Sequence, residues 1–208
     1  LLGNAGVTAL EIVLGMLLGT LLGSGTALVL GYSRRARRWL LPMLIASQAI
    51  PVFAIAPLLV LWLGYGMASK IAMTVLIIYF PVTANFYDGL RHVPSGWLDL
   101  ARVMMVEPRR WAVLRHIALP SALPALASGL RVAAAVAPIG AVLGEWVGAG
   151  AGLGYLMLHA NSRMQVDLMF AALVTLATLA IGLYFAVDAA LKRLLPWHPA
   201  HPETVDTG

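Results

Sequence analysis

Long continuous runs of apolar residues are the feature that most limits how this chain can fold. A helix needs roughly 20 mainly apolar residues to cross a hydrocarbon core about 30 Å thick, and the sequence offers about five such runs. We place these predicted spans at Ile12–Tyr32, Leu40–Leu63, Ile71–Tyr87, Ala122–Leu143 and Leu168–Leu191. Because the runs are continuous and do not alternate, they predict an all-α integral membrane protein rather than a β-barrel.

Charged residues are few, and their positions predict a topology. Only 11% of the residues are charged, fewer than in ordinary soluble domains. Eleven of the 14 Lys and Arg residues follow the first, third and fifth predicted spans, within 34–38, 91–115 and 192–193. Lys70 and Arg163 fall in the opposite loops, and Arg131 lies inside a span. The positive-inside rule makes the basic side cytoplasmic, so the net charge of +5 indicates topology and not nucleic-acid binding.

The two ends of the chain carry further expectations. The chain begins at Leu1 without a signal-peptide pattern, and we interpret it as a fragment or a trimmed product. Residues 1–195 are predicted to form one transmembrane domain whose first residues lie outside. The Pro-rich, polar residues 196–208 are predicted to be a disordered cytoplasmic tail. Because the chain has no cysteine, we predict neither a disulfide nor a thiolate metal site, and no other cofactor is expected.

The basic loop at about 91–120 interrupts the apolar pattern. Pro94 and Pro108 are predicted to bracket a short helix and Pro120 to close a second, because proline lacks a donor and disfavours helix in the preceding residue. The second helix is predicted to place Trp111, Leu114 and Ala118 on one face and Arg109 and His116 opposite. Residue chemistry leaves two interpretations open, namely an interfacial helix at the membrane surface and a docking site for a soluble partner.

The end of this loop resembles that of a known family. Permease subunits of binding-protein-dependent ABC importers carry a cytoplasmic loop of the pattern Glu-Ala-Ala, three residues, Gly, nine residues, Ile-x-Leu-Pro. The closing part is present as IALPSALP at 117–124, preceded by RRW. Counting back from Pro120, the family Glu falls on Ala101 and the Gly on Glu107, unless two inserted residues make Asp99 the start. The first half of the motif is therefore degenerate, although Pro108 can break the helix where the glycine would.

The resemblance covers nearly the whole chain and implies a division of labour. YFPVTANFYDGLRHVP at 79–94 and GEWVGAGAGLGYLM at 144–157 look like the branch handling nitrate, sulfonates, taurine and thiamine pyrimidine precursors. The longer stretch 144–173 looks most like permeases for the hydroxymethylpyrimidine precursor. Family permeases usually have one more span before Ile12, which implies that an N-terminal piece is missing.

The family also implies partners and a location. The resemblance implies a permease in the bacterial inner membrane that pairs with a second copy, while an extracytoplasmic binding protein delivers the solute. Cytoplasmic ABC ATPase subunits would dock on the loop, and the residues proposed for this coupling are Asp99, Ala101, Arg102, Met104, Met105, Glu107, Pro108 and Arg109. Met104 and Met105 would pack into the partner, with Arg102 and Glu107 at the rim.

Other motifs argue against catalysis by this chain. GxxxxGK[ST], HExxH and GxSxG are absent, and GYGMASK at 64–70 has the wrong spacing for a phosphate loop and is assigned to an outer turn. His159 and Ser162 are close in sequence, but a polar outer loop is the preferred interpretation. A secondary transporter or channel remains the rival class. The sequence shows neither the inverted repeats nor the several midplane ionisable groups common in such proteins.

Polar residues within the spans are candidates for the solute path. Glu145 and Trp146, at the outer end of the fourth span, are either path residues or interfacial anchors. Gln48 and Asn85 are path candidates too, with helix–helix hydrogen bonding as their preferred role. Arg131 is assigned to snorkelling or anchoring ahead of solute contact. The glycine-rich stretch 148–155 is expected to form a flexible outer turn or a re-entrant piece.

Overall fold

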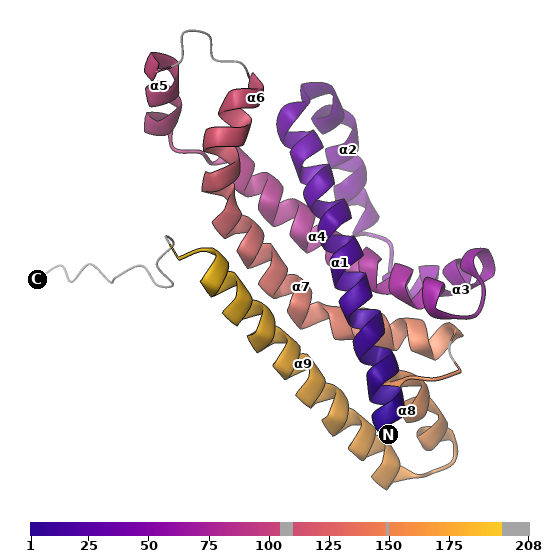
Figure 1. Ribbon diagram of the computed structural model, residues 1–208. Coiled ribbons are helices and arrows are strands. Elements are labelled where there is room, and N and C mark those ends of the chain that lie inside the picture. The colour runs from indigo at the N-terminus through magenta and orange to yellow at the C-terminus, as the bar shows by residue number, and fades with distance from the viewer. Residues whose placement is uncertain (105–109, 149, 197–208) are drawn as a thin grey trace, which may run out of the picture.

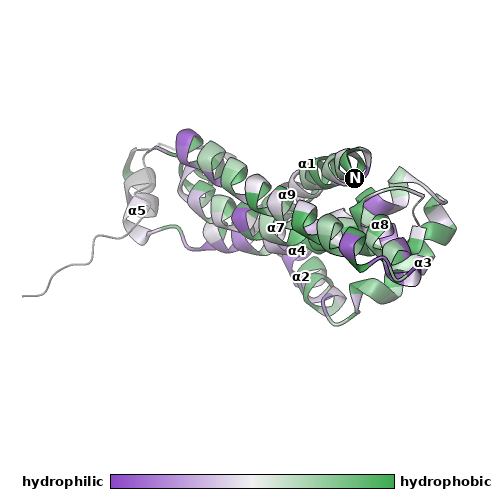
Figure 2. Ribbon diagram, turned by 90° about the horizontal axis from the view of Figure 1, so that it is seen from below, coloured by the Kyte–Doolittle hydropathy of each residue, from purple (hydrophilic) through white to green (hydrophobic). Residues whose placement is uncertain are grey.

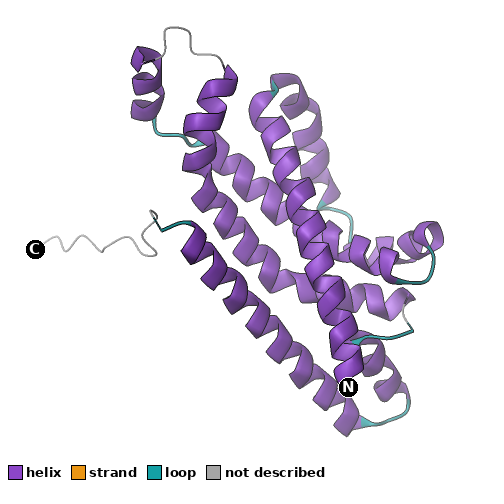
Figure 3. Cartoon of the chain, viewed as in Figure 1, coloured by secondary structure: helices purple, strands orange, loops and turns teal. Residues whose placement is uncertain are grey.

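The computed structural model describes residues 1–104, 110–148 and 150–196, and within them the secondary structure is entirely helical (Figures 1 and 3). The helices are α1 (Leu2–Tyr32), α2 (Arg34–Ser47), α3 (Val52–Leu63), α4 (Met67–Arg91), α5 (Ser95–Met104), α6 (Arg110–Val113), the π-helical turn η1 (Leu114–Ala118), α7 (Leu119–Gly148), α8 (Leu153–Ser162) and α9 (Val166–Leu194). The all-α class predicted from the sequence is confirmed. The predicted tail lies almost wholly outside the described residues.

Within the described residues, four helices are long and apolar enough to cross a membrane. They are α1, α4, α9 and one unbroken helix from Trp111 to Gly148 that joins α6, η1 and α7. The second predicted span, Leu40–Leu63, is wrong as a single helix, because α2 and α3 meet at an angle of 102°. Pro51 explains the break, since it lacks an amide donor and disfavours helix at Ile50. The pair is therefore a broken span or a re-entrant segment.

α1 and α4 begin earlier than the sequence predicts, and both shifts bring a charged residue inside the bundle. α1 starts at Leu2 instead of Ile12, so Glu11 lies within it. α4 starts at Met67 instead of Ile71, which corrects the assignment of Lys70 to an outer loop. The turn before α4 uses Gly64 and Gly66, whose φ angles of 80° and 153° favour glycine.

Pro120 does not close a helix, contrary to the prediction. The helix continues through Pro120 into α7 because the preceding turn widens to a π-helix, in which the amide of Leu119 bonds to the carbonyl of Leu114. A proline ring clashes with the carbonyl four residues earlier, and a widened turn relieves that clash. Leu114 and Ala118 pack into the bundle as predicted for one face. Trp111 instead stays 62% exposed.

α4 is the central helix, and glycines on two neighbours allow close approach to it. Gly15, Gly19 and Gly23 of α1 face Thr74, Ile78 and Val82 of α4. Gly140 and Gly144 of α7 face the other side of α4, where an added Cβ would lie 2.7 Å from Thr74 Cα and 2.9 Å from Lys70 Cα respectively. Small residues at four-residue spacing are typical of tightly packed transmembrane helices. This packing explains why α1, α4 and α7 form the core.

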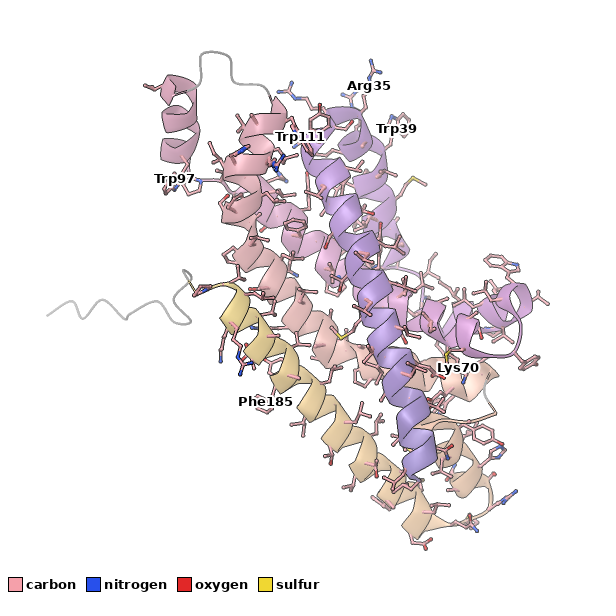
Figure 4. All side chains as sticks on the ribbon, viewed as in Figure 1. Arg35, Trp39, Lys70, Trp97, Trp111 and Phe185 are labelled. Atoms are coloured by element: carbon pink, nitrogen blue, oxygen red, sulfur yellow. The ribbon has the colours of Figure 1, made fainter. Side chains whose placement is uncertain are left out.

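The outer surface of the bundle is apolar. In α9 only 6% of the most apolar stretch is buried within the chain, and Phe170, Val174 and Phe185 are each more than half exposed. Figure 2 shows hydrophobic residues along the long helices, and Figure 4 shows Phe185 pointing away from the bundle. Such a surface requires lipid or another apolar protein face.

Replacing Gly144 by Val is expected to destabilise the bundle by roughly 1–3 kcal/mol, because the added methyl groups overpack the α4–α7 contact. The midpoint of thermal unfolding in detergent, followed by loss of the monodisperse peak, measures this effect. Gly25→Val is the matched control, since nothing lies within 4 Å of a Cβ at that position. Equal midpoints for the two variants would contradict the proposed packing.

Candidate functional site

The predicted coupling segment lies at the end of the molecule that carries most basic residues. α5 begins directly after Pro94, as predicted, and stands beside the end of the bundle where α6 begins in Figure 1. The backbone of α5 includes Asp99, Ala101, Arg102 and Met104. The remaining coupling candidates lie outside the described residues, and these are Met105, Glu107, Pro108 and Arg109. The docking role of this set stays a prediction.

Two apolar side chains of α5 are open to a partner. Val103 is 85% exposed and Trp97 is 58% exposed. Figure 4 shows Trp97 at the edge of the molecule, on the side of α5 away from α1. Exposed apolar groups on a short amphipathic helix are typical of a surface that another protein covers.

At the opposite end, Glu145 is buried inside the chain. Its side chain is 1% exposed and accepts hydrogen bonds from Thr8 Oγ1 at 2.6 Å and from the Gly154 amide at 2.5 Å. Thr8 Oγ1 in turn accepts the amide of Leu153 at 2.8 Å. The carboxyl group therefore ties the start of α8 to α1. The roles of Glu145 in the solute path or as an interfacial anchor stay predictions.

A glycine makes this arrangement possible. Gly152 has a φ of 122° and lies against the Glu145 carboxylate so closely that any side chain there would overlap it. The glycine-rich stretch predicted as an outer turn thus forms the cradle for Glu145, followed by α8. The neighbouring Trp146 is 43% exposed on the surface of α7, and its path role stays a prediction.

A buried ion pair lies close to Glu145. Lys70 Nζ is 2.7 Å from Glu11 Oε1, and the two residues are 5% and 0% exposed (Figure 4). Glu11 Oε2 has no hydrogen-bond partner among the described residues. Burial of charge is costly unless it is paired, so the ammonium group is what allows Glu11 to remain inside. Hydropathy gave no sign of this cluster of ionisable groups, because both residues lie outside the predicted spans.

The other path candidates make local hydrogen bonds instead of the predicted helix–helix ones. Asn85 Nδ2 donates to the Pro81 carbonyl at 2.8 Å, and Gln48 Nε2 donates to Ser47 Oγ at 3.3 Å. Asn85 also lines a cavity of about 390 Å³ between α2 and α4, beside Tyr87 and other residues. Gln48 is exposed at the end of α2. A path role for Asn85 and Gln48 stays a prediction.

Arg131 pairs with the carboxylate of Asp188, a partner that the sequence alone did not indicate. Its Nε donates to Asp188 Oδ1 at 2.7 Å, and Lys192 Nζ lies 2.7 Å from Asp188 Oδ2. The pair joins α7 to the C-terminal part of α9 and borders a cavity of about 1010 Å³ between α4, α7 and α9. Anchoring, the preferred interpretation of Arg131, therefore has a definite partner.

Comparison with known proteins identifies the relatives of this chain. The family described as "Binding-protein-dependent transport system inner membrane component" matches residues 15–197. The chain is 64% identical to a "Probable ABC transporter permease protein" of Haemophilus influenzae, over 91% of this chain and 76% of that one. It is 40% identical to the "Formylaminopyrimidine transport permease protein ThiX" of Halalkalibacterium halodurans, over 91% and 72%.

A solved structure shares the fold. An inward-facing structure of the MetNI methionine ABC transporter superposes with a TM-score of 0.78, covering 93% of this chain and 95% of that chain at 19% identity. The resemblance read from the loop and its flanks is therefore confirmed. The family match, which extends from α1 through the end of α9, shows that the chain belongs to the inner membrane components of binding-protein-dependent transport systems, the ABC importer permeases.

Proposed function

We propose that this permease forms one half of a path for a small polar solute, and that the solute is a pyrimidine of the thiamine-precursor class. The observation that carries the substrate is the 40% identity to a permease named for formylaminopyrimidine. The stretch 144–173, which forms the end of α7, α8 and the start of α9, supports the same class through its family resemblance. Sulfonates, taurine and nitrate are the alternative solutes.

A second copy of the chain completes the path. Within its described residues one chain offers four long spans and a bent pair, which form one wall of the proposed path. The apolar outer face of α9 and the exposed surfaces of α2 and α3 are available to a second copy. A separate pair of cytoplasmic ATPases would dock on α5, and an extracytoplasmic binding protein would deliver the solute at the opposite end.

The long helix from Trp111 to Gly148 supports a mechanism for coupling. Its 38 residues span about 57 Å at 1.5 Å per residue, and it follows directly on the docking loop. At its far end Glu145 holds the start of α8 against α1. When ATP closes the ATPase dimer, motion of the docking loops would be carried along this helix as a rigid-body rotation. The two copies would then open the path alternately to either side.

The orientation is tested by labelling single cysteines, which is straightforward because the chain has none. We expect Ser162→Cys, near the end of α8, to react in intact cells with a membrane-impermeant maleimide. Arg109→Cys should react only after the membrane is opened, because the positive-inside rule places the docking loop in the cytoplasm. If Arg109→Cys were labelled in intact cells and Ser162→Cys were not, the topology would be the reverse of the proposed one.

The substrate is tested by uptake into cells that lack their own pyrimidine-precursor importer. The permease is expressed with its neighbouring ATPase and binding protein, and uptake of radiolabelled formylaminopyrimidine is compared with that of taurine. We expect uptake of the pyrimidine alone, and excess unlabelled hydroxymethylpyrimidine should compete. Transport of taurine without transport of either pyrimidine would transfer the protein to the sulfonate branch.

A further inference from the structure

An apolar groove opens between the end of α1 and the start of the long helix that carries the docking loop. It has a volume of about 460 Å³, and its walls are formed by Leu28, Val29, Tyr32, Trp111, Leu114 and Leu119. Val29 lies in a membrane span and is 49% exposed, as a lipid-facing residue would be. The groove therefore continues the lipid-facing surface of the bundle inward. It is separate from the cavities beside Asn85 and Arg131.

Two aromatic side chains mark the depth of this groove. Tyr32 and Trp111 are 54% and 62% exposed, and their rings meet edge to face with centroids 6.5 Å apart. Exposed Tyr and Trp side chains gather where the hydrocarbon core meets the headgroups. The mouth of the groove is therefore at headgroup level, and its aliphatic part reaches into the hydrocarbon.

Arg115 is the charged residue that lines the groove, and its position favours binding of an anion. It is exposed within the π-helical turn, four residues further into the long helix than Trp111, which corresponds to about 6 Å of depth. No salt bridge is found for Arg115 among residues 1–104, 110–148 and 150–196. A cation near the edge of the hydrocarbon is costly unless it is paired or reaches the headgroups. π-Helical turns are frequent at functional sites, and this one sets the direction of Arg115.

A second source of positive charge meets the groove at Ser33. Ser33 lines the groove and caps α2, where its Oγ accepts the Ala36 amide at 3.2 Å. The residues that follow Ser33 include four arginines and no acidic residue in the first helical turn, and these arginines are Arg34, Arg35, Arg37 and Arg38. The start of a helix already carries a partial positive charge, so this arrangement is unfavourable without an anion nearby. Figure 4 shows Arg35 and Trp111 at the same end of the molecule.

We propose that this groove binds one anionic phospholipid of the cytoplasmic leaflet. An acyl chain lies against Val29 and Leu119, and the phosphate sits at the mouth between Arg115 and Ser33. The aliphatic walls fit an acyl chain, and the surplus of arginines fits a negatively charged headgroup better than a zwitterionic one. The lipid would join α1 to the helix that follows the docking loop. Bound lipid is thus a structural component of the coupling end of this permease.

Native mass spectrometry of the permease–ATPase complex, titrated with dioleoylphosphatidylglycerol or dioleoylphosphatidylcholine, tests the proposal. We expect one phosphatidylglycerol for each permease chain and weaker binding of phosphatidylcholine. Arg115→Gln should weaken phosphatidylglycerol binding about fivefold, the usual effect of one basic side chain at an anionic surface, and Arg115→Lys should largely restore it. Val29→Trp should fill the groove and abolish the bound lipid. Arg193→Gln is the matched control, because it removes an exposed arginine from the last turn of α9, outside the groove.

The outcomes separate a lipid from other occupants. Equal binding of the two lipids, or unchanged phosphatidylglycerol binding in both Arg115→Gln and Val29→Trp, would overturn the proposal. Loss of the ATPase from these variants with lipid binding unchanged would identify the groove as a protein contact and would also overturn it. Circular dichroism and gel filtration of each variant show that the helices and the assembly are intact, so that loss of lipid reports on the groove.

Discussion

The Met104→Asp, Met105→Asp double variant of the permease is expected to lose its ATPase during purification and to stop transporting solute. These residues end α5 or follow it directly, and the proposed docking role places them in a pocket of the ATPase. Methionine is unbranched and adapts to such a pocket. Two carboxylates buried there without partners cost several kcal/mol, enough to separate the subunits. Co-purification of a tagged ATPase and solute uptake measure the effect.

The control changes a methionine at the other end of the molecule. Met164 is 82% exposed between α8 and α9, so Met164→Asp should keep both the ATPase and the transport rate. The double variant must still insert and dimerise, which gel filtration checks. If Met104→Asp with Met105→Asp retains its ATPase and its uptake, then α5 is only an interfacial helix and coupling occurs elsewhere.

Replacing Lys70 by Met is expected to destabilise the permease by about 3–5 kcal/mol, the usual cost of removing one partner of a buried pair. Met approximates the length of the Lys side chain but leaves Glu11 buried without its cation. Glu145, also buried, adds a second carboxyl group nearby. The expected result is low yield in the membrane and a large fall in the thermal midpoint in detergent.

A double variant distinguishes this charge effect from poor packing. Lys70→Met combined with Glu11→Leu removes both charges and should recover most of the lost stability, because apolar replacements of a buried pair are often well tolerated. Lys192→Met is the control, since the Lys192 side chain is 58% exposed and its pairing with Asp188 is screened by water. A Lys70→Met permease as stable as the Lys192→Met one would show that the buried pair contributes little.

Hydropathy predicted the four long spans because each is a continuous apolar run with few charges. It failed at Leu40–Leu63, where the same apolar signal continues through a bend of 102°. Hydropathy does not distinguish a straight helix from two short ones, but Pro51 after the polar Gln48 was a local signal for the break. Pro120 gave the opposite error, because it predicted a helix end where the helix in fact continues. A widened turn accommodated it, and nothing in the sequence specifies a π-helix.

The buried cluster was missed for a related reason. Glu11 and Lys70 are 59 residues apart in sequence, and each directly precedes the first residue of a predicted span. A charged residue at the edge of an apolar run looks like the end of the span, although α1 extends nine residues before Glu11. Only the approach of α4 to α1, through Gly15 and its neighbours, brings the two charges together. The pairing of Arg131 with Asp188 depends on tertiary packing in the same way.

The central claim is that this chain conducts solute only when a separate subunit hydrolyses ATP, and reconstitution tests it most directly. Proteoliposomes are prepared with the permease alone and with the permease plus its ATPase, and both receive the binding protein loaded with labelled pyrimidine. We expect no ATP hydrolysis and no uptake with the permease alone, and ATP-dependent accumulation of the solute with the ATPase present. Uptake by the permease alone, or ATP hydrolysis by it, would contradict this dependence on a separate ATPase.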